Sequence, residues 1–144
     1  MESRLEISTM KTEGSETSYT QLTLTIFATK DRIEEVLAAI DRIPDTKRAF
    51  SGDARPNSLF GGENYSVIAY RAWSEKSATE AAKDFWGEFS NHLGKLDLSG
   101  GIKLRLGVFI AGRNDSGGAE FWAEPSMLAD WAKMDIQFNI EFSE

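Results

Sequence analysis

The chain has no cysteine and only one histidine among its 144 residues. The lack of cysteine excludes a disulfide framework, a zinc site built from thiolates and catalysis by a thiol. The single histidine, His92, is a candidate general base, but it falls at the edge of the apolar face of a predicted helix. A partly buried structural ring is the simpler interpretation, because no nucleophile-elbow pattern supplies a partner for it.

Long hydrophobic runs are also missing. No apolar segment approaches the length that crosses a bilayer, and the first residues lack the basic and apolar regions of a signal peptide. We therefore expect a cytoplasmic protein. Basic residues are few, 16 against 23 acidic, and the net charge of −7 disfavours binding to nucleic acid or to an anionic membrane. For a protein partner, the same charge favours a basic one.

Recognisable cofactor motifs are absent as well. The glycine pairs at 61–62, 100–101 and 117–118 match neither the Walker spacing nor the dinucleotide fingerprint. Carboxylates are plentiful, but they show no calcium-loop spacing and are typical of a solvated surface. We therefore predict no cofactor, no metal and no catalytic residues.

The clearest positive signal is a helix over residues 77–96. Ser77 and Glu80 have the spacing of a capping box, in which each residue can bond the backbone amide of the other. The apolar residues that follow recur at helical spacing on one face: Ala78, Ala82, Phe85, Phe89, Leu93 and Leu96. Such a helix needs a hydrophobic sheet or a second helix to cover this face.

The rest of the chain alternates between strand and helix patterns. Strands are predicted at about 19–27, 65–73, 102–111 and 136–142, with helices at about 31–40 and 125–133. Residues 45–63 form the longest irregular stretch. Because each strand has one polar face, we expect an α+β domain and not a doubly wound parallel sheet.

The predicted architecture has two layers: a sheet of four to five strands, mainly antiparallel or mixed, and about three helices on one face. Residues 18–144 form this single domain. Residues 1–17 are either an N-terminal arm or a short edge strand.

Three surfaces are candidates for partner binding. The first is the long loop with Arg48, Asp53 and Arg55. The second is Trp122 with Glu120 and Glu124, between a glycine turn and a helix start. The third is the polar face of the strands, comprising Thr23, Thr25, Lys103, Arg105, Gln137, Asn139 and Glu141. Aromatic residues such as Trp73 could line a groove, although aromatic side chains are more often part of a core.

Seven features in order resemble the bacterial domain-of-unknown-function family numbered 4279, over about residues 18–142. They are the strand Leu22 to Phe27, the helix Ile33-Glu-Glu-Val-Leu, the Gly52-Asp53 loop, a strand ending at Trp73, the long helix, the strand Leu104 to Ile110, and Met127-Leu-Ala-Asp-Trp-Ala followed by Ile136 to Phe142. The last strand reads Asn139-Ile-Glu-Phe, where that family usually ends in an acidic-aromatic signature. The resemblance implies a small cytoplasmic α+β protein and carries over no catalytic residue.

Small acidic single-domain proteins of this kind also resemble immunity proteins. We therefore predict a non-catalytic protein-binding domain, an immunity or inhibitor protein that neutralises a basic bacterial toxin by direct binding. Two alternatives stay open. One is an enzyme or small-ligand-binding protein with a pocket near Trp73 and Trp122, and the other is a homodimeric structural module.

Overall fold

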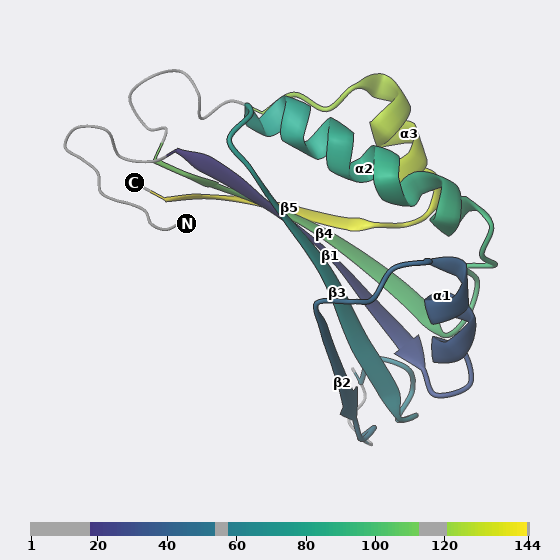
Figure 1. The fold of residues 1–144 in the computed structure, drawn as a ribbon. Coiled ribbons are helices and arrows are strands. Elements are labelled where there is room, and N and C mark those ends of the chain that lie inside the picture. Colours follow the sequence, from purple (N-terminus) through teal and green to yellow (C-terminus); the bar gives the residue numbers. More distant parts are fainter. Residues whose placement is uncertain (1–17, 54–57, 113–120, 144) are drawn as a thin grey trace.

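The computed structural model describes residues 18–53, 58–112 and 121–143. Within these ranges the chain forms five strands and three helices (Figure 1). In chain order these are β1 (Tyr19–Thr29), α1 (Ile33–Ala39), β2 (Thr46–Phe50), β3 (Tyr65–Ser74), α2 (Ala78–Gly94), β4 (Ile102–Ala111), α3 (Pro125–Lys133) and β5 (Gln137–Ser143). No helix in these described ranges is long and apolar enough to cross a membrane.

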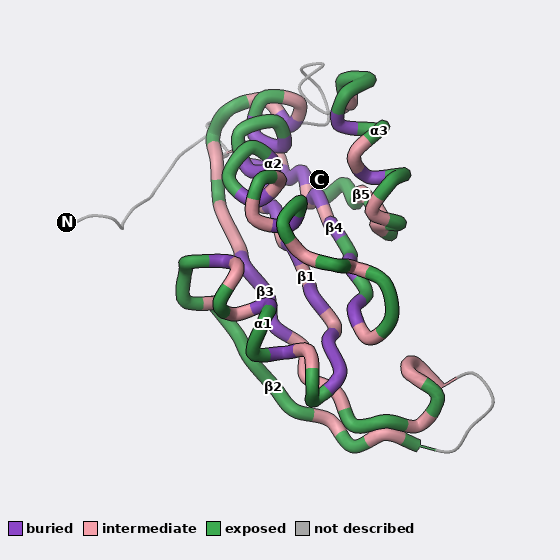
Figure 2. The backbone as a smooth tube through the Cα atoms, turned by 90° about the vertical axis from the view of Figure 1, so that its right-hand side faces the viewer, coloured by how far each residue is buried: buried purple, intermediate pink, exposed green. Residues whose placement is uncertain are grey.

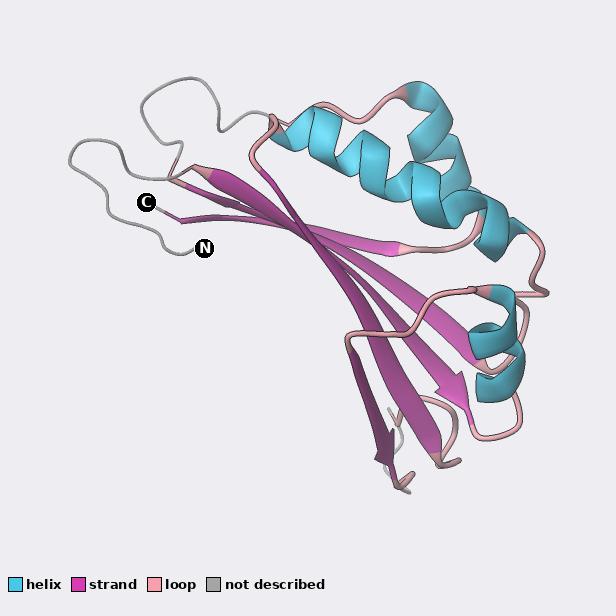
Figure 3. Cartoon of the chain, viewed as in Figure 1, coloured by secondary structure: helices cyan, strands magenta, loops and turns pink. Residues whose placement is uncertain are grey.

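The strands form one mixed sheet in the order β2-β3-β1-β4-β5. β1 pairs antiparallel with β3 and β4, β2 pairs antiparallel with β3, and β5 runs parallel to β4. β1, α1 and β2 form a split βαβ unit, because β3 lies between two strands that run the same way. The three described helices lie on one side of the twisted sheet, and none of them covers its other side (Figure 3).

The core lies between the helices and the sheet. Alternate residues of β1, including Leu22, Leu24 and Ile26, are buried and pack with Phe85 and Phe89 of α2. Figure 2 shows this as buried segments along β1 and β4 and on the inner side of α2. The period-2 pattern of the strands and the 3.6-residue pattern of α2 therefore meet at a single interface.

The long helix has the Ser77 cap that its sequence predicts, but the Glu80 carboxylate meets the Ser77 hydroxyl and not the Ser77 amide. The Ser77 hydroxyl oxygen accepts a hydrogen bond from the Glu80 amide at 3.3 Å, and the Ser77 hydroxyl lies 3.2 Å from the Glu80 carboxylate. This supplies an acceptor for one of the free amides at the helix N-terminus.

The predicted two-layer α+β fold is confirmed: a five-stranded mixed sheet with three helices. The prediction that residues 45–63 are irregular is wrong for Thr46–Phe50, which form β2. β2 lies at the sheet edge with four of its five residues exposed, so it has no alternation of buried and polar positions. The alternative of an edge strand or arm at 1–17 lies outside the described residues.

Candidate functional site

We call the sheet surface that points away from the helices the open face. It consists of every second strand residue, those that alternate with the buried core positions. Its central rows run across β3, β1, β4 and β5 in register: Trp73, Gln21, Phe109 and Glu141; then Arg71, Thr23, Gly107 and Asn139; then Ala69, Thr25, Arg105 and Gln137. The polar row expected from the sequence does lie on this surface.

The open face is positively charged although the chain is acidic. Its described strand positions carry four of the 16 basic residues and only one of the 23 acidic residues. The basic residues are Arg48, Arg71, Lys103 and Arg105, and the acidic residue is Glu141. None of these four cations forms an ion pair within the described ranges. In contrast, Arg42 and Lys76 pair with carboxylates of α2, and Lys83 pairs with Glu124 just before α3.

One end of the open face carries three aromatic rings. Tyr19 contacts Trp73 with ring centroids 5.0 Å apart and Phe109 with centroids 6.3 Å apart. Trp73 is 61% exposed, which is unusual for so large an apolar side chain. We call Tyr19, Trp73 and Phe109 the aromatic cluster. It offers apolar surface to a partner directly beside the central polar rows.

At the other end, cations lie over aromatic rings. The guanidinium groups of Arg105 and Arg48 lie 5.1 Å from the ring centroids of Phe27 and Phe50, respectively. The Lys103 amine lies 5.7 Å from the ring of Phe60. Each contact is a cation–π interaction that holds a positive charge at the surface without neutralising it.

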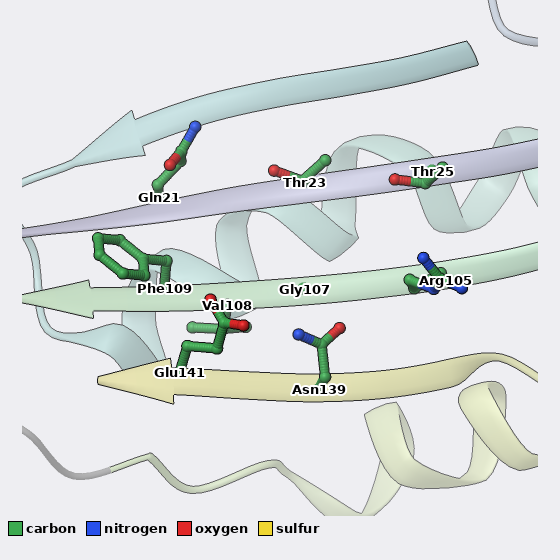
Figure 4. A pocket seen from close by; sticks show the side chains of 9 residues that line it. All are labelled: Gln21, Thr23, Thr25, Arg105, Gly107, Val108, Phe109, Asn139 and Glu141. Atoms are coloured by element: carbon green, nitrogen blue, oxygen red, sulfur yellow. The ribbon is translucent and has the colours of Figure 1, made fainter. Parts of the chain in front are cut away.

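A hollow of about 280 Å³ lies at the centre of the open face (Figure 4). Its floor includes Gly107 of β4, which has no side chain to fill the space between Thr23 and Asn139. Asn139 and Glu141 extend from β5 toward β4, and Phe109 and Arg105 lie at opposite ends. The hollow therefore offers a guanidinium, a carboxylate, hydroxyls, amides and one ring within reach of a single ligand.

Trp122 and Glu124, both predicted partner-binding residues, lie on the helix side. The Trp122 amide donates to the Thr79 hydroxyl at 2.9 Å, and Glu124 forms an ion pair of 3.1 Å with Lys83. Trp122 is 70% exposed. The structure does not bring it together with Trp73, which lies on the open face.

Asp53 lies in the loop after β2 and is exposed, close to the start of β3. Trp122 lies beside the start of α2, just beyond the other end of β3, so the structure does not join these two predicted sites into one surface. Arg55 and Glu120 lie outside the described residues. The binding roles of Asp53, Arg55, Glu120, Trp122 and Glu124 stay predictions.

Shifted acid–base groups occur away from the hollow. The Ser99 hydroxyl and amide donate to the Asp97 carboxylate and lower its pKa. Burial raises the pKa of Tyr70, whose hydroxyl has no hydrogen-bond partner among the described residues. In the described ranges, no group of three or more His, Cys, Asp or Glu side chains is placed to hold a metal ion.

The sequence analysis missed the grouping of Tyr19, Trp73 and Phe109 and the open-face cation Arg71. It assigned Arg48 to the long loop, whereas Arg48 lies in β2. The signal for Phe109 was present, because it occupies an outward position in the alternation of β4. Trp73 and Arg71 likewise alternate with the core residues of β3. Nothing in the sequence, however, indicates that β3 and β4 flank β1 and bring these side chains together.

Comparisons with protein-family models, with curated proteins and with solved structures found no match to this chain. The resemblance to family 4279 therefore stays a prediction.

Proposed function

We propose that this protein is a non-catalytic protein-binding domain that docks its partner on the open face, as an inhibitor does when it neutralises another protein by covering it. The observation that carries the proposal is a group of cations without an ion pair in the described ranges, next to the aromatic cluster with its exposed Trp73. Both lie on a sheet surface that none of the three described helices covers. Residues buried at the centre of protein interfaces are enriched in tryptophan, tyrosine and arginine.

The chemistry of this face favours an acidic patch on the partner. Charges farther apart than about 8 Å are largely screened at physiological ionic strength, so local charge dominates at contact. Arg71 and Arg105 on the open face therefore outweigh the net charge of −7. A basic toxin, as the net charge suggests, would instead meet the acidic helix side near Trp122.

Two exposed tryptophans provide a matched test. Trp73 lies on the open face at 61% exposure, and Trp122 lies on the helix side at 70%. Tagged wild-type, Trp73→Ala and Trp122→Ala proteins would be used to capture partners, at low salt, from cells that encode the protein. Quantitative mass spectrometry would compare the proteins retained by each.

We expect a stoichiometric partner to be retained by Trp122→Ala and weakened about 30-fold or more by Trp73→Ala, the effect of losing an interface residue worth about 2 kcal/mol. Arg71→Glu should weaken capture as well, while the charge-matched Lys133→Glu on α3 should not. A partner lost only with Trp122→Ala would contradict docking on the open face and favour the helix side.

A further inference from the structure

The central hollow has features that protein docking alone does not explain. Gly107 lies within the β4 ladder without a positive φ, so its backbone does not require glycine. A Cβ atom built there would lie 3.4 Å from Asn139 Oδ1, with no closer contact. A glycine in a strand interior weakens the sheet and often marks a place where a ligand approaches the backbone.

The hollow has opposite charges at its two ends. Arg105 and Phe109 are four residues apart in β4, a distance of about 13 Å along an extended strand. Glu141 lies opposite Phe109 in the neighbouring strand. A ligand that fills the hollow would place an anionic group at Arg105 and hydrogen-bond donors at Glu141.

We infer that this hollow binds a guanine nucleotide, with the phosphate at Arg105 and the base at Glu141. An ionised carboxylate only accepts hydrogen bonds, and guanine presents two adjacent N–H donors on one edge. The adjacent Phe109 ring offers a surface for the base, and the Thr25 hydroxyl offers a second donor to the phosphate. In a nucleotide the ribose separates the phosphate from the base, so the two groups can reach Arg105 and Glu141 at opposite ends of the hollow.

The nucleotide is either free or one residue of a single strand. Lys103, Arg48 and Arg71 lie on the same face outside the lining of the hollow, where only a longer strand would reach them. The net charge of the chain disfavours binding to nucleic acid. The open face is locally positive, however, and a single-stranded nucleic acid bound there would contact its cations and not the acidic surface elsewhere. The inference goes beyond the proposed protein docking and does not depend on it.

Guanosine monophosphate is the first probe, with adenosine monophosphate and guanosine for comparison, in titrations at low salt followed by calorimetry. We expect the guanine nucleotide to bind at least 10-fold more tightly than either of the others. Adenosine monophosphate lacks the guanine donors to Glu141, and guanosine lacks the phosphate that would bind Arg105. Losing one such charge-assisted interaction lowers affinity by a factor of about 10 to 100.

Three variants test the contacts. Glu141→Gln should abolish the preference over the adenine nucleotide, and Arg105→Gln should reduce guanosine monophosphate to the affinity of guanosine. Gly107→Val should fill the hollow and prevent binding. Lys133→Met on α3 removes a charge outside the open face and should leave the affinity unchanged, and circular dichroism would check that each variant is folded.

A seven-nucleotide RNA with one guanosine among uridines, and its adenosine counterpart, would identify the source. Tighter binding of the guanosine strand than of the mononucleotide, with a loss on Lys103→Met, would assign a single strand. Equal affinities would assign the free nucleotide. The inference is overturned if folded wild-type protein shows no binding to guanosine monophosphate at millimolar concentration, or binds all three probes alike. Either result leaves the tryptophan capture experiment unaffected.

Discussion

Gly100 and Gly101, in the turn before β4, allow the cost of a strained backbone to be measured separately from the cost of a steric clash. Gly100 and Gly101 both have positive φ, 62° and 81°. A Cβ atom at Gly100 would have nothing within 4 Å, whereas one at Gly101 would lie 2.7 Å from Thr29 Oγ1 and 2.9 Å from Arg32 Cγ. We predict that Gly101→Ala destabilises the protein clearly more than Gly100→Ala.

The magnitude follows from the groups that must move. A left-handed conformation costs a residue other than glycine about 1–2 kcal/mol. Replacing glycine by alanine also reduces the conformational entropy of the unfolded chain, which offsets about 0.4–1 kcal/mol of that cost. Gly100→Ala should therefore cost about 1 kcal/mol. Gly101→Ala should also displace Arg32, which donates to backbone carbonyls at Asp97, Ser99 and Gly100, for a total of about 2–4 kcal/mol.

Thermal and urea unfolding followed by circular dichroism would measure both variants. At about 2–4 °C per kcal/mol for a chain of this size, Gly101→Ala should lower Tm by roughly 4–16 °C. In a double-mutant cycle, Thr29→Ala should relieve part of the cost of Gly101→Ala, because it removes the nearest atom. Equal losses for the two glycine variants, within about 0.5 kcal/mol, would refute the steric reasoning.

Three further predictions concern stability. Gly52→Ala should lower the free energy of unfolding in urea by about 3 kcal/mol or more, because the new Cβ would lie 1.8 Å from the Gly62 carbonyl oxygen. Near-wild-type stability would contradict this, since it would mean that the backbone around Gly52 and Gly62 can move apart at little cost. Tyr70→Phe should be neutral or stabilising by about 1 kcal/mol, since the buried hydroxyl has no partner, and a clear loss would reveal one. Asp97→Asn should lower Tm at neutral pH, and the Tm difference from wild type should close as pH falls below about 4. The reason is that the Asp97 carboxyl has a lower pKa in the folded than in the unfolded protein, so the stability it contributes is lost when it is protonated. A Tm difference that persists at pH 2 would contradict this.

The proposed occupants of the open face compete for the same surface. The hollow lies in the central rows beside the aromatic cluster, so a bound guanine nucleotide would lie beneath a docked protein. If both proposals hold, guanosine monophosphate should reduce capture of the partner by wild-type protein. It should have no effect on capture by Gly107→Val.

Local periodicity predicted which side chains of β1, β4 and α2 face the core. Leu104, Leu106 and Val108 alternate with polar or small residues, and alternation across a pleated strand fixes opposite faces whatever the neighbours are. β2 escaped prediction because an edge strand with exposed residues has no such pattern. The sequence by itself thus determined the two-layer class and the polar residues that β1, β4 and β5 place on the open face.

Only the tertiary structure decided what that face presents. Arg71, Thr23, Gly107 and Asn139 come from four strands far apart in the chain, and the order β3-β1-β4-β5 places them in one row. Strand order and register depend on hydrogen bonds between distant segments, which leave no local pattern in the sequence. The net charge of −7 was fixed by composition, but the gathering of unpaired cations on one face followed from how the strands pair.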